Sequence, residues 1–310
     1  MKSLWKRFLS PIRFFFLSAV LLLIFPLSAR GDIAGDFAAG LPDQAVLSNA
    51  RQAGNLSDRQ IIATAIGVGM DAASATAAAV SIGMPATAVV AAAIESGGST
   101  QEVVSAAVEA GGRTPEVVKA ALGAGGEIKE VATAAIQAGA NVSEVVTAAI
   151  EAQANPMLVT SAAIRAGGDA GEVVTAALLV NANVISVTTA AIRAGGSASE
   201  VVTAALDLNA DLATVTSTAI RAGANATDVV TAAVSSSGDA AGVTMAAIRA
   251  GGDTAAIVIA AISVAPAQKK AVVTAAIASG ADESEVLGAA IIGQENSEDP
   301  VDEDMVPSPS

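Results

Sequence analysis

The 310-residue sequence contains no cysteine, no histidine and no tyrosine. The missing cysteine excludes a disulfide framework and a thiol nucleophile, and the missing histidine removes the commonest general base. Without either residue, the usual ligands of soft metals are absent too. Beyond residue 25, Phe37 is the only aromatic side chain, so the platforms on which proteins stack sugars or bases are missing. We therefore predict a protein that is not an enzyme, with no catalytic residue, no cofactor and no metal site.

The N-terminal residues 1–29 have the composition of a secretory signal peptide. A basic stretch is followed by an apolar stretch and a small-residue cleavage site, carried by Lys2, Lys6, Arg7 and Arg13, by residues 14–25 and by Leu27, Ser28 and Ala29. The alternative is an uncleaved membrane anchor, but the apolar stretch is shorter than the roughly 20 residues that a spanning helix needs. We predict an exported protein, secreted or periplasmic, that has no stable membrane insertion after cleavage.

The chain is strongly acidic. Its net charge is −14, and it becomes −18 without residues 1–29, which carry four basic side chains and no acidic one. A negative surface repels the phosphate backbone of nucleic acids, so we expect no nucleic-acid partner.

A 14-residue repeat occupies most of the chain. An apolar residue preceded by Ala recurs every 14 residues from Ile66 to Ile262, and after one extra residue near Pro266 it recurs at Ile277 and Ile291. A short fixed period of this kind indicates a stacked-repeat architecture.

Helix-start signals recur with the same period. Five residues after the apolar position stands a residue typical of helix N-caps, at Ser99, Asn141, Asn155, Asp169, Asn183, Ser197, Asp211, Asn225, Asp239 and Asp253. An acid often follows three residues later, as in Ser99/Glu102 and Ser197/Glu200, where it could complete a capping box. Pro115 and Pro156 are expected at the first helical position.

Helix-stop signals bracket each unit at the other end. Three residues after the apolar position stands Gly, at 69, 83, 97, 111, 125, 139, 167, 195, 223 and 251, or Asn, at 181 and 209. Both residues tolerate the left-handed conformation that ends a helix. Each unit is thus predicted to be one helix of about three turns. The Val-Val-Thr runs alone would favour strands, which leaves a short-rung β-solenoid as the alternative.

A second period of 28 residues overlies the first. From Ile164 onward, Arg follows the apolar position only in every other unit. We predict an α-solenoid of 14-residue single-helix repeats that pair into 28-residue helical hairpins. The expected divisions are a signal peptide (1–29), an N-terminal helical cap (30–56), the repeat domain (57–293) and a disordered acidic tail (294–310). The tail is interpreted as solubilising, with docking to a basic partner as the alternative.

The recurring arginines are the candidate partner-binding residues: Arg165, Arg193, Arg221 and Arg249. Spaced one per hairpin, they would suit an anionic polymer or an acidic protein. The structural alternative is that each Arg only complements the helix macrodipole and pairs with Glu172, Glu200 or Asp228 at the start of the next helix.

Two other recurring sets have weaker functional interpretations. A threonine column could form a regular surface array, but back-bonding within each helix explains it better: Thr133, Thr147, Thr175, Thr189, Thr203 and Thr231. The capping Asp and Asn residues could ligate calcium, but they occur singly and capping explains them.

These observations favour a binding scaffold that presents an extended surface to a protein or an anionic polymer outside the cytosol. The alternative is a structural or self-assembling matrix protein, so self-association stays possible.

Overall fold

The computed structural model describes residues 32–297, and within this range the protein is all-helical. Nineteen consecutive α-helices of similar length pack against their neighbours, and no strand occurs among the described residues. This arrangement is that of an α-solenoid, and the alternative of a β-solenoid is wrong for this part of the chain. The predicted signal peptide lies outside the described residues.

The helices and the single 3-10 turn follow one another through short connections. Their bounds are α2 (Ile33–Ala38), α3 (Asp43–Ala53), α4 (Asp58–Gly67), α5 (Ala72–Ser81), α6 (Ala86–Glu95), α7 (Thr100–Glu109), α8 (Thr114–Gly123), α9 (Ile128–Gln137), α10 (Val142–Glu151), α11 (Pro156–Arg165), α12 (Ala170–Leu179), α13 (Val184–Arg193), α14 (Ala198–Asp207), α15 (Leu212–Arg221), α16 (Ala226–Ser237), α17 (Ala240–Arg249), α18 (Thr254–Val264), η1 (Pro266–Gln268), α19 (Lys269–Ala278) and α20 (Glu283–Ser297).

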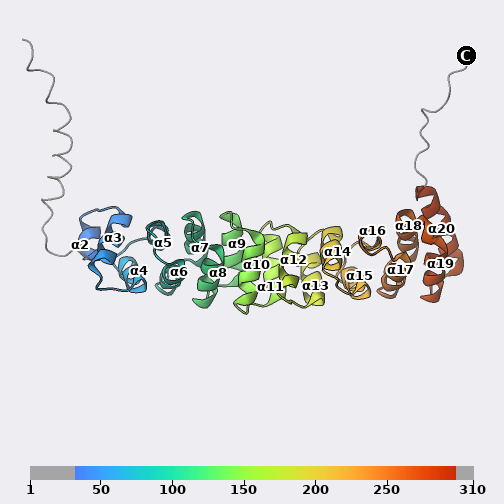
Figure 1. The fold of residues 1–310 in the computed structure, drawn as a ribbon, viewed down its shortest axis with the longest axis horizontal. Coiled ribbons are helices and arrows are strands. Elements are labelled where there is room, and N and C mark those ends of the chain that lie inside the picture. The colour runs from blue at the N-terminus through green and yellow to red at the C-terminus, as the bar shows by residue number, and fades with distance from the viewer. Residues whose placement is uncertain (1–31, 298–310) are drawn as a thin grey trace, which may run out of the picture.

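The helices form two layers that run the length of an elongated molecule (Figure 1). Helices two apart in the chain pack side by side within a layer, and consecutive helices lie in opposite layers. The odd-numbered helices α5, α7 and α9 lie at the top of the view, whereas α15, α17 and α19 lie at the bottom. The two layers therefore wind around each other along the stack, as small rotations between successive repeats produce.

The predicted caps start the helices. All ten predicted N-cap side chains accept a hydrogen bond from a first-turn backbone N–H. The predicted reciprocal boxes at Ser99/Glu102 and Ser197/Glu200 are wrong, because only the serine half of each is formed. A full capping box occurs instead at Ser57 and Gln60. Pro156 is the first residue of α11 as predicted, whereas Pro115 is the second residue of α8.

The predicted stops also hold. Every glycine of the stop column, and both Asn181 and Asn209, has a positive φ. Gln153 occupies the same place after α10 with φ 65°, although glutamine disfavours this conformation. In α16 the stop position is Ser237, so that helix runs two residues longer, to Ser237, and Gly238 with φ 71° is its C-cap.

The core consists of small apolar side chains on the inward stripe of each helix. In α10, Val145, Val146 and Ala149 are fully buried, while Glu144 and Glu151 on the opposite stripe are exposed. Alanine permits close approach between the backbones of neighbouring helices. The connections between helices also pack closely against the adjacent helix. A Cβ added at Gly196 would lie 2.8 Å from the Cβ of Ala170 in the adjacent helix. Burial of the valine pairs, at about 1.5–3 kcal/mol per side chain, is the main stabilising term.

The one insertion in the repeat is accommodated at η1. Pro266 ends α18, and the extra residue is taken up by one 3-10 turn before α19. The side chain of Gln268 then bonds to the start of α17, the neighbouring helix in the layer of α19: its Oε1 accepts from Ala240 N at 3.1 Å, and its Nε2 donates to Gly238 O at 2.6 Å. The start of α19 is thus held against the start of α17.

The ends differ in part from the sequence-based divisions. Two helices, α2 and α3, lie in the segment predicted to form the N-terminal cap. At the other end α20 extends to Ser297, so residues 294–297, predicted to be disordered, are helical because they continue the last repeat. Residues 298–310 lie outside the described residues.

Among residues 32–297 no single helix is long and apolar enough to cross a membrane. One pair, Thr254–Val264 with Pro266–Ala278, passes the same test of length and hydropathy together, with a bend of 119° between its halves.

Candidate binding surface: the arginine row

The four candidate arginines lie in one layer of the stack. Each is the last residue of its helix, α11, α13, α15 or α17, and each is followed by an Ala C-cap and a left-handed glycine. These helices pack successively side by side, so the arginines form a row along one edge of the layer. Helices pack 8–10 Å apart, which sets the spacing of the row at about 10 Å. We call this set the arginine row.

The arginine row is exposed and has no ionic partner in residues 32–297. All four side chains are solvent-exposed, and none forms an ion pair with a described residue. The predicted pairing with Glu172, Glu200 and Asp228 is therefore not formed. Glu172 instead bonds to Ser143 of the neighbouring α10, accepting from its N at 3.2 Å and its Oγ at 2.9 Å. The guanidinium groups are left with free donors.

Ion pairs form elsewhere, in the N-terminal half of the stack. They join Arg51 to Asp58, Arg59 to Glu95, Arg113 to Glu116 and Lys119 to Glu151. The arginine row thus differs from these basic residues because it has no acidic side chain within ion-pair distance among the described residues. The difference is not one of exposure, since the four ion pairs also lie at the surface. Its position at helix C-termini is favourable in itself, since cations stabilise the negative end of the macrodipole.

A surface groove runs between α13 and α15 beside two arginines of the row. Its volume is about 330 Å³, and Arg193 and Arg221 line one end of it. The remaining lining residues are Ile185, Thr189, Thr214, Ser217, Thr218 and Ala222. On α13 the lining residues are spaced by four, so they form a single exposed stripe of that helix. The groove offers hydroxyl groups and one apolar side chain leading to a pair of guanidinium groups.

The opposite end of the groove begins at the N-cap of α15. The Asp211 carboxylate accepts hydrogen bonds from the Thr214 hydroxyl at 2.7 Å and the Thr214 N–H at 2.8 Å. These bonds, the hydroxyl first, lower the pKa of Asp211 below its ordinary value. Because α15 is one helix of three turns, the carboxylate of Asp211 and the guanidinium of Arg221 lie at opposite ends of the helix, about 15 Å apart. An anionic group is attracted to the arginine end alone.

The other sequence candidates do not gather into a site. The threonines of the predicted column are half-buried, except for the exposed Thr231. The capping carboxylates are engaged with helix starts, and residues 32–297 contain no group of three or more acidic side chains placed to hold a metal ion. The capping residues therefore keep their structural explanation. The back-bonding predicted for the threonine column is not formed among the described residues, and it occurs instead at Thr76, Thr244 and Thr274.

Sequence reasoning missed two features. The first is the groove itself. Its lining residues on α13, such as Ile185, and those on α15, such as Thr218, become neighbours of one another only when the two helices pack. The sequence did offer one signal: Ile185 lies eight residues before Arg193 and Thr218 lies three residues before Arg221, so each shares a helix face with an arginine. The second is a column of fully buried threonines, at Thr76, Thr160, Thr188, Thr216 and Thr244. Four of these lie in the helices that carry the arginine row, which marks these helices as chemically distinct from their neighbours.

No protein-family model matches the chain, and no curated protein is significantly similar to it.

Proposed function

We propose that this protein is an exported, non-enzymatic scaffold whose arginine row binds an extended anionic partner, either an acidic polymer or an acidic segment of a protein. The observation that carries the proposal is the row of exposed guanidinium groups without ionic partners among the described residues. Four cations in register on an otherwise acidic chain form a local positive stripe. A partner with anionic groups at a matching spacing would gain several charge-assisted hydrogen bonds at once.

The groove between α13 and α15 supports the same proposal. Arg193 and Arg221 converge on its end, and Thr189 and Thr218 add hydroxyl donors and acceptors along its walls. Such a surface favours a flexible chain over a globular ligand, because the groove lies between α13 and α15 and the arginine row continues beyond it on α11 and α17. The central pair of arginines is therefore the part of the row on which binding should depend most.

We also propose that the repeat unit underlying this surface is the 28-residue hairpin, built from two 14-residue helices. Both the arginines and the buried threonines recur in alternate helices, which supports a unit of two. The proposal of export rests on the composition of residues 1–29 and is tested by N-terminal sequencing of the protein recovered outside the cytosol.

The test of binding uses poly-glutamate of graded length as the anionic probe, with the chain from residue 30 onward. We expect affinity to rise with probe length, and the double variant Arg193→Ala/Arg221→Ala to bind about tenfold or more weakly with an unchanged helical circular dichroism spectrum. The matched control is Arg59→Ala/Arg113→Ala, which removes two arginines that are already paired. Equal losses in both double variants would show that only net charge matters and would overturn the proposed site. Affinity capture from envelope and culture-fluid extracts then identifies the natural partner.

A further inference from the structure

The C-terminal end of the stack exposes apolar residues whose equivalents in the preceding helix of the same layer are buried. Leu287 and Ile291 on α20 are 48% and 57% exposed, and Ile292 beside them is 47% exposed. In the preceding helix of the same layer, α18, the equivalent positions are Val258 and Ile262, and both are fully buried. The helix α20 packs on α18, whereas no described helix packs on the outward side of α20.

The exposure is specific to this side of α20. The opposite stripe is packed tightly: a Cβ added at Gly293 would lie 3.0 Å from the Ile259 carbonyl oxygen of α18, and the Ser263 hydroxyl donates to Gly293 O at 3.3 Å. The helix is therefore apolar on both sides but covered on only one. Within the stack, the corresponding side of each helix is covered by the next helix of its layer. At this end that side of α20 is uncovered, and a further helix packed on it would be stabilising.

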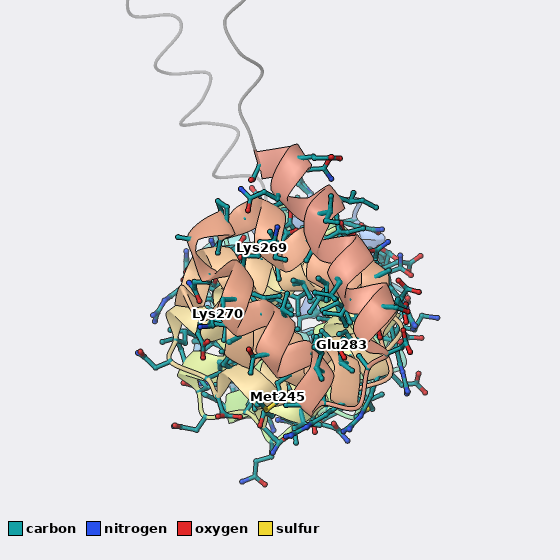
Figure 2. All side chains as sticks on the ribbon, turned by 90° about the vertical axis from the view of Figure 1, so that its right-hand side faces the viewer. Met245, Lys269, Lys270 and Glu283 are labelled. Carbon is teal, nitrogen blue, oxygen red and sulfur yellow. The ribbon has the colours of Figure 1, made fainter. Side chains whose placement is uncertain are left out.

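Charges of opposite sign flank the apolar residues. Figure 2 views the end of the stack and shows Lys269 and Lys270 of α19 on one side of the end face and Glu283 of α20 on the other. The two lysines stand in the first turn of their helix, where the macrodipole disfavours cations. Glu283 and Glu285 stand in the first turn of α20. Neither the lysines nor the glutamates form an ion pair with another residue in 32–297.

From this juxtaposition we infer that the end face, formed by the outward sides of α19 and α20, docks on the same face of a second copy of this chain. The lysines begin α19 and the glutamates begin α20, so the two charged groups lie at opposite ends of the face. A two-fold axis in the plane of the face, perpendicular to the line that joins these groups, brings the lysines of each copy to the glutamates of the other. The same rotation brings Leu287 and Ile291 of both copies into the contact, between the two pairs of charged groups. Such an isologous contact closes after two copies, so it doubles the length of the rod and does not propagate.

The self-complementary charges favour a second copy over other occupants. A basic partner would be attracted to the glutamates but repelled by Lys269 and Lys270, and an acidic partner would meet the reverse. Residues 298–310 of the same chain carry acidic groups and little apolar surface, so they match neither the apolar centre nor the glutamate side. A second copy supplies both signs of charge and the missing apolar layer together.

The first experiment is sedimentation velocity on the chain from residue 30 onward over a range of concentrations. A concentration-dependent dimer is expected, and Leu287→Gln/Ile291→Gln should raise its dissociation constant about tenfold or more, because two apolar side chains leave the contact. The control Leu158→Gln/Leu179→Gln changes two exposed apolar residues on the side of the rod, 53% and 66% exposed, and should leave the dissociation constant unchanged. A monomer at every concentration overturns the inference.

Charge exchange tests the geometry of the contact. Lys269→Glu/Lys270→Glu and Glu283→Lys/Glu285→Lys should each dimerise about tenfold or more weakly alone, and mixing the two variants should restore a heterodimer. Thermal unfolding by circular dichroism verifies that each variant is folded. Failure of the mixture to associate rejects the two-fold arrangement. A chain that dimerises only after removal of residues 298–310 assigns the face to that segment and also overturns the inference.

Discussion

At the scale of the residue, Gln153 is in a conformation that its neighbours in the repeat reserve for glycine or asparagine. Its φ of 65° follows from its place after α10, where the helix must end. A non-glycine residue pays a steric cost for this conformation, since its Cβ approaches the following carbonyl. The repeat geometry therefore overrides the preference of the side chain.

We predict that Gln153→Gly raises the free energy of unfolding by about 0.5–1 kcal/mol, because removal of the steric cost outweighs the added freedom of the unfolded chain. The measurement is urea unfolding followed by circular dichroism. The reciprocal change Gly167→Gln, at the stop after α11, serves as the control and should be destabilising. A variant Gln153→Gly no more stable than the parent would show that the turn relieves this strain in another way.

The buried threonines form a second test at this scale. Among the described residues, the hydroxyls of Thr160, Thr188 and Thr216 have no hydrogen-bond partner, whereas the Thr244 hydroxyl donates to Ala240 O at 2.7 Å. A buried hydroxyl without a partner is costly, and valine has nearly the same shape.

We therefore expect Thr188→Val to raise the free energy of unfolding by about 1 kcal/mol, as judged from the shift of the urea transition. The matched variant Thr244→Val loses a hydrogen bond in exchange for the same methyl group, so its gain should be smaller or absent. Equal effects of the two substitutions would mean that Thr188 is satisfied in solution, for example by the carbonyl four residues before it.

At the scale of the element, each helix is too short to be stable alone, so it depends on its cap and its neighbours. The caps are of two kinds, neutral Asn or Ser and ionised Asp. Hydrogen bonds from Ser74 lower the pKa of Asp71, and those from Thr214 lower the pKa of Asp211. A carboxylate whose pKa is lowered on folding contributes stability above its unfolded pKa and loses that contribution as the pH falls through its folded pKa.

We predict that Asp211→Asn reduces the acid sensitivity of the protein. At pH 7 the variant keeps a competent cap, because asparagine caps α10 and α13 in the same way. As the pH falls below 3.8, the ordinary pKa of an aspartate, and through the lowered pKa of Asp211, the parent loses the Asp211 contribution and the variant does not. The difference in thermal midpoint between variant and parent should thus move in favour of the variant on acidification. A difference independent of pH would contradict the cap bonds described for Asp211.

At the scale of the whole molecule, helices contact only their near neighbours, so stability should be a sum over adjacent units. Removal of residues 170–197, which comprise α12 and α13, joins the cap Asp169 directly to Ala198 at the start of α14. Each remaining helix then stays in its own layer. We predict a folded chain with helicity reduced only in proportion to its length.

The control is removal of residues 170–183, a single 14-residue unit. This shorter deletion keeps a cap at the new junction but shifts α13 and every later helix to the opposite layer. We expect the 14-residue deletion to lower the thermal midpoint more than the 28-residue deletion does. After the shorter deletion, the arginine-bearing helices α13, α15 and α17 lie in the layer that α12, α14 and α16 normally occupy, so their side chains meet neighbours that do not match them. Equal midpoints would favour a unit of 14 residues over the proposed 28.

Local features of this chain were predictable from its sequence because they depend on a few adjacent residues. The caps from Ser99 to Asp253 and the left-handed stops at Asn181 and Asn209 follow from side-chain reach and backbone sterics within one turn. The errors at this level were also local, such as the incomplete box at Ser99 and the single-residue displacement of Pro115. The groove at Arg193 and the pairing of Glu172 with Ser143 were not predictable, because each joins residues of different helices.

The sequence by itself determined that this protein is a series of short, similar units and favoured helices for them, since caps, small apolar residues and stops alternate at the spacing of a three-turn helix. The structure then excluded strands among the described residues. Only the tertiary structure decided which helices share a layer, and hence that the arginines line one edge without ionic partners among the described residues. It also decided that Leu287 and Ile291 are exposed, whereas the equivalent Val258 and Ile262 of α18 are buried. The physical reason is that burial and ion pairing depend on what lies beside a helix, and in a repeat every unit has nearly the same sequence but not the same neighbours.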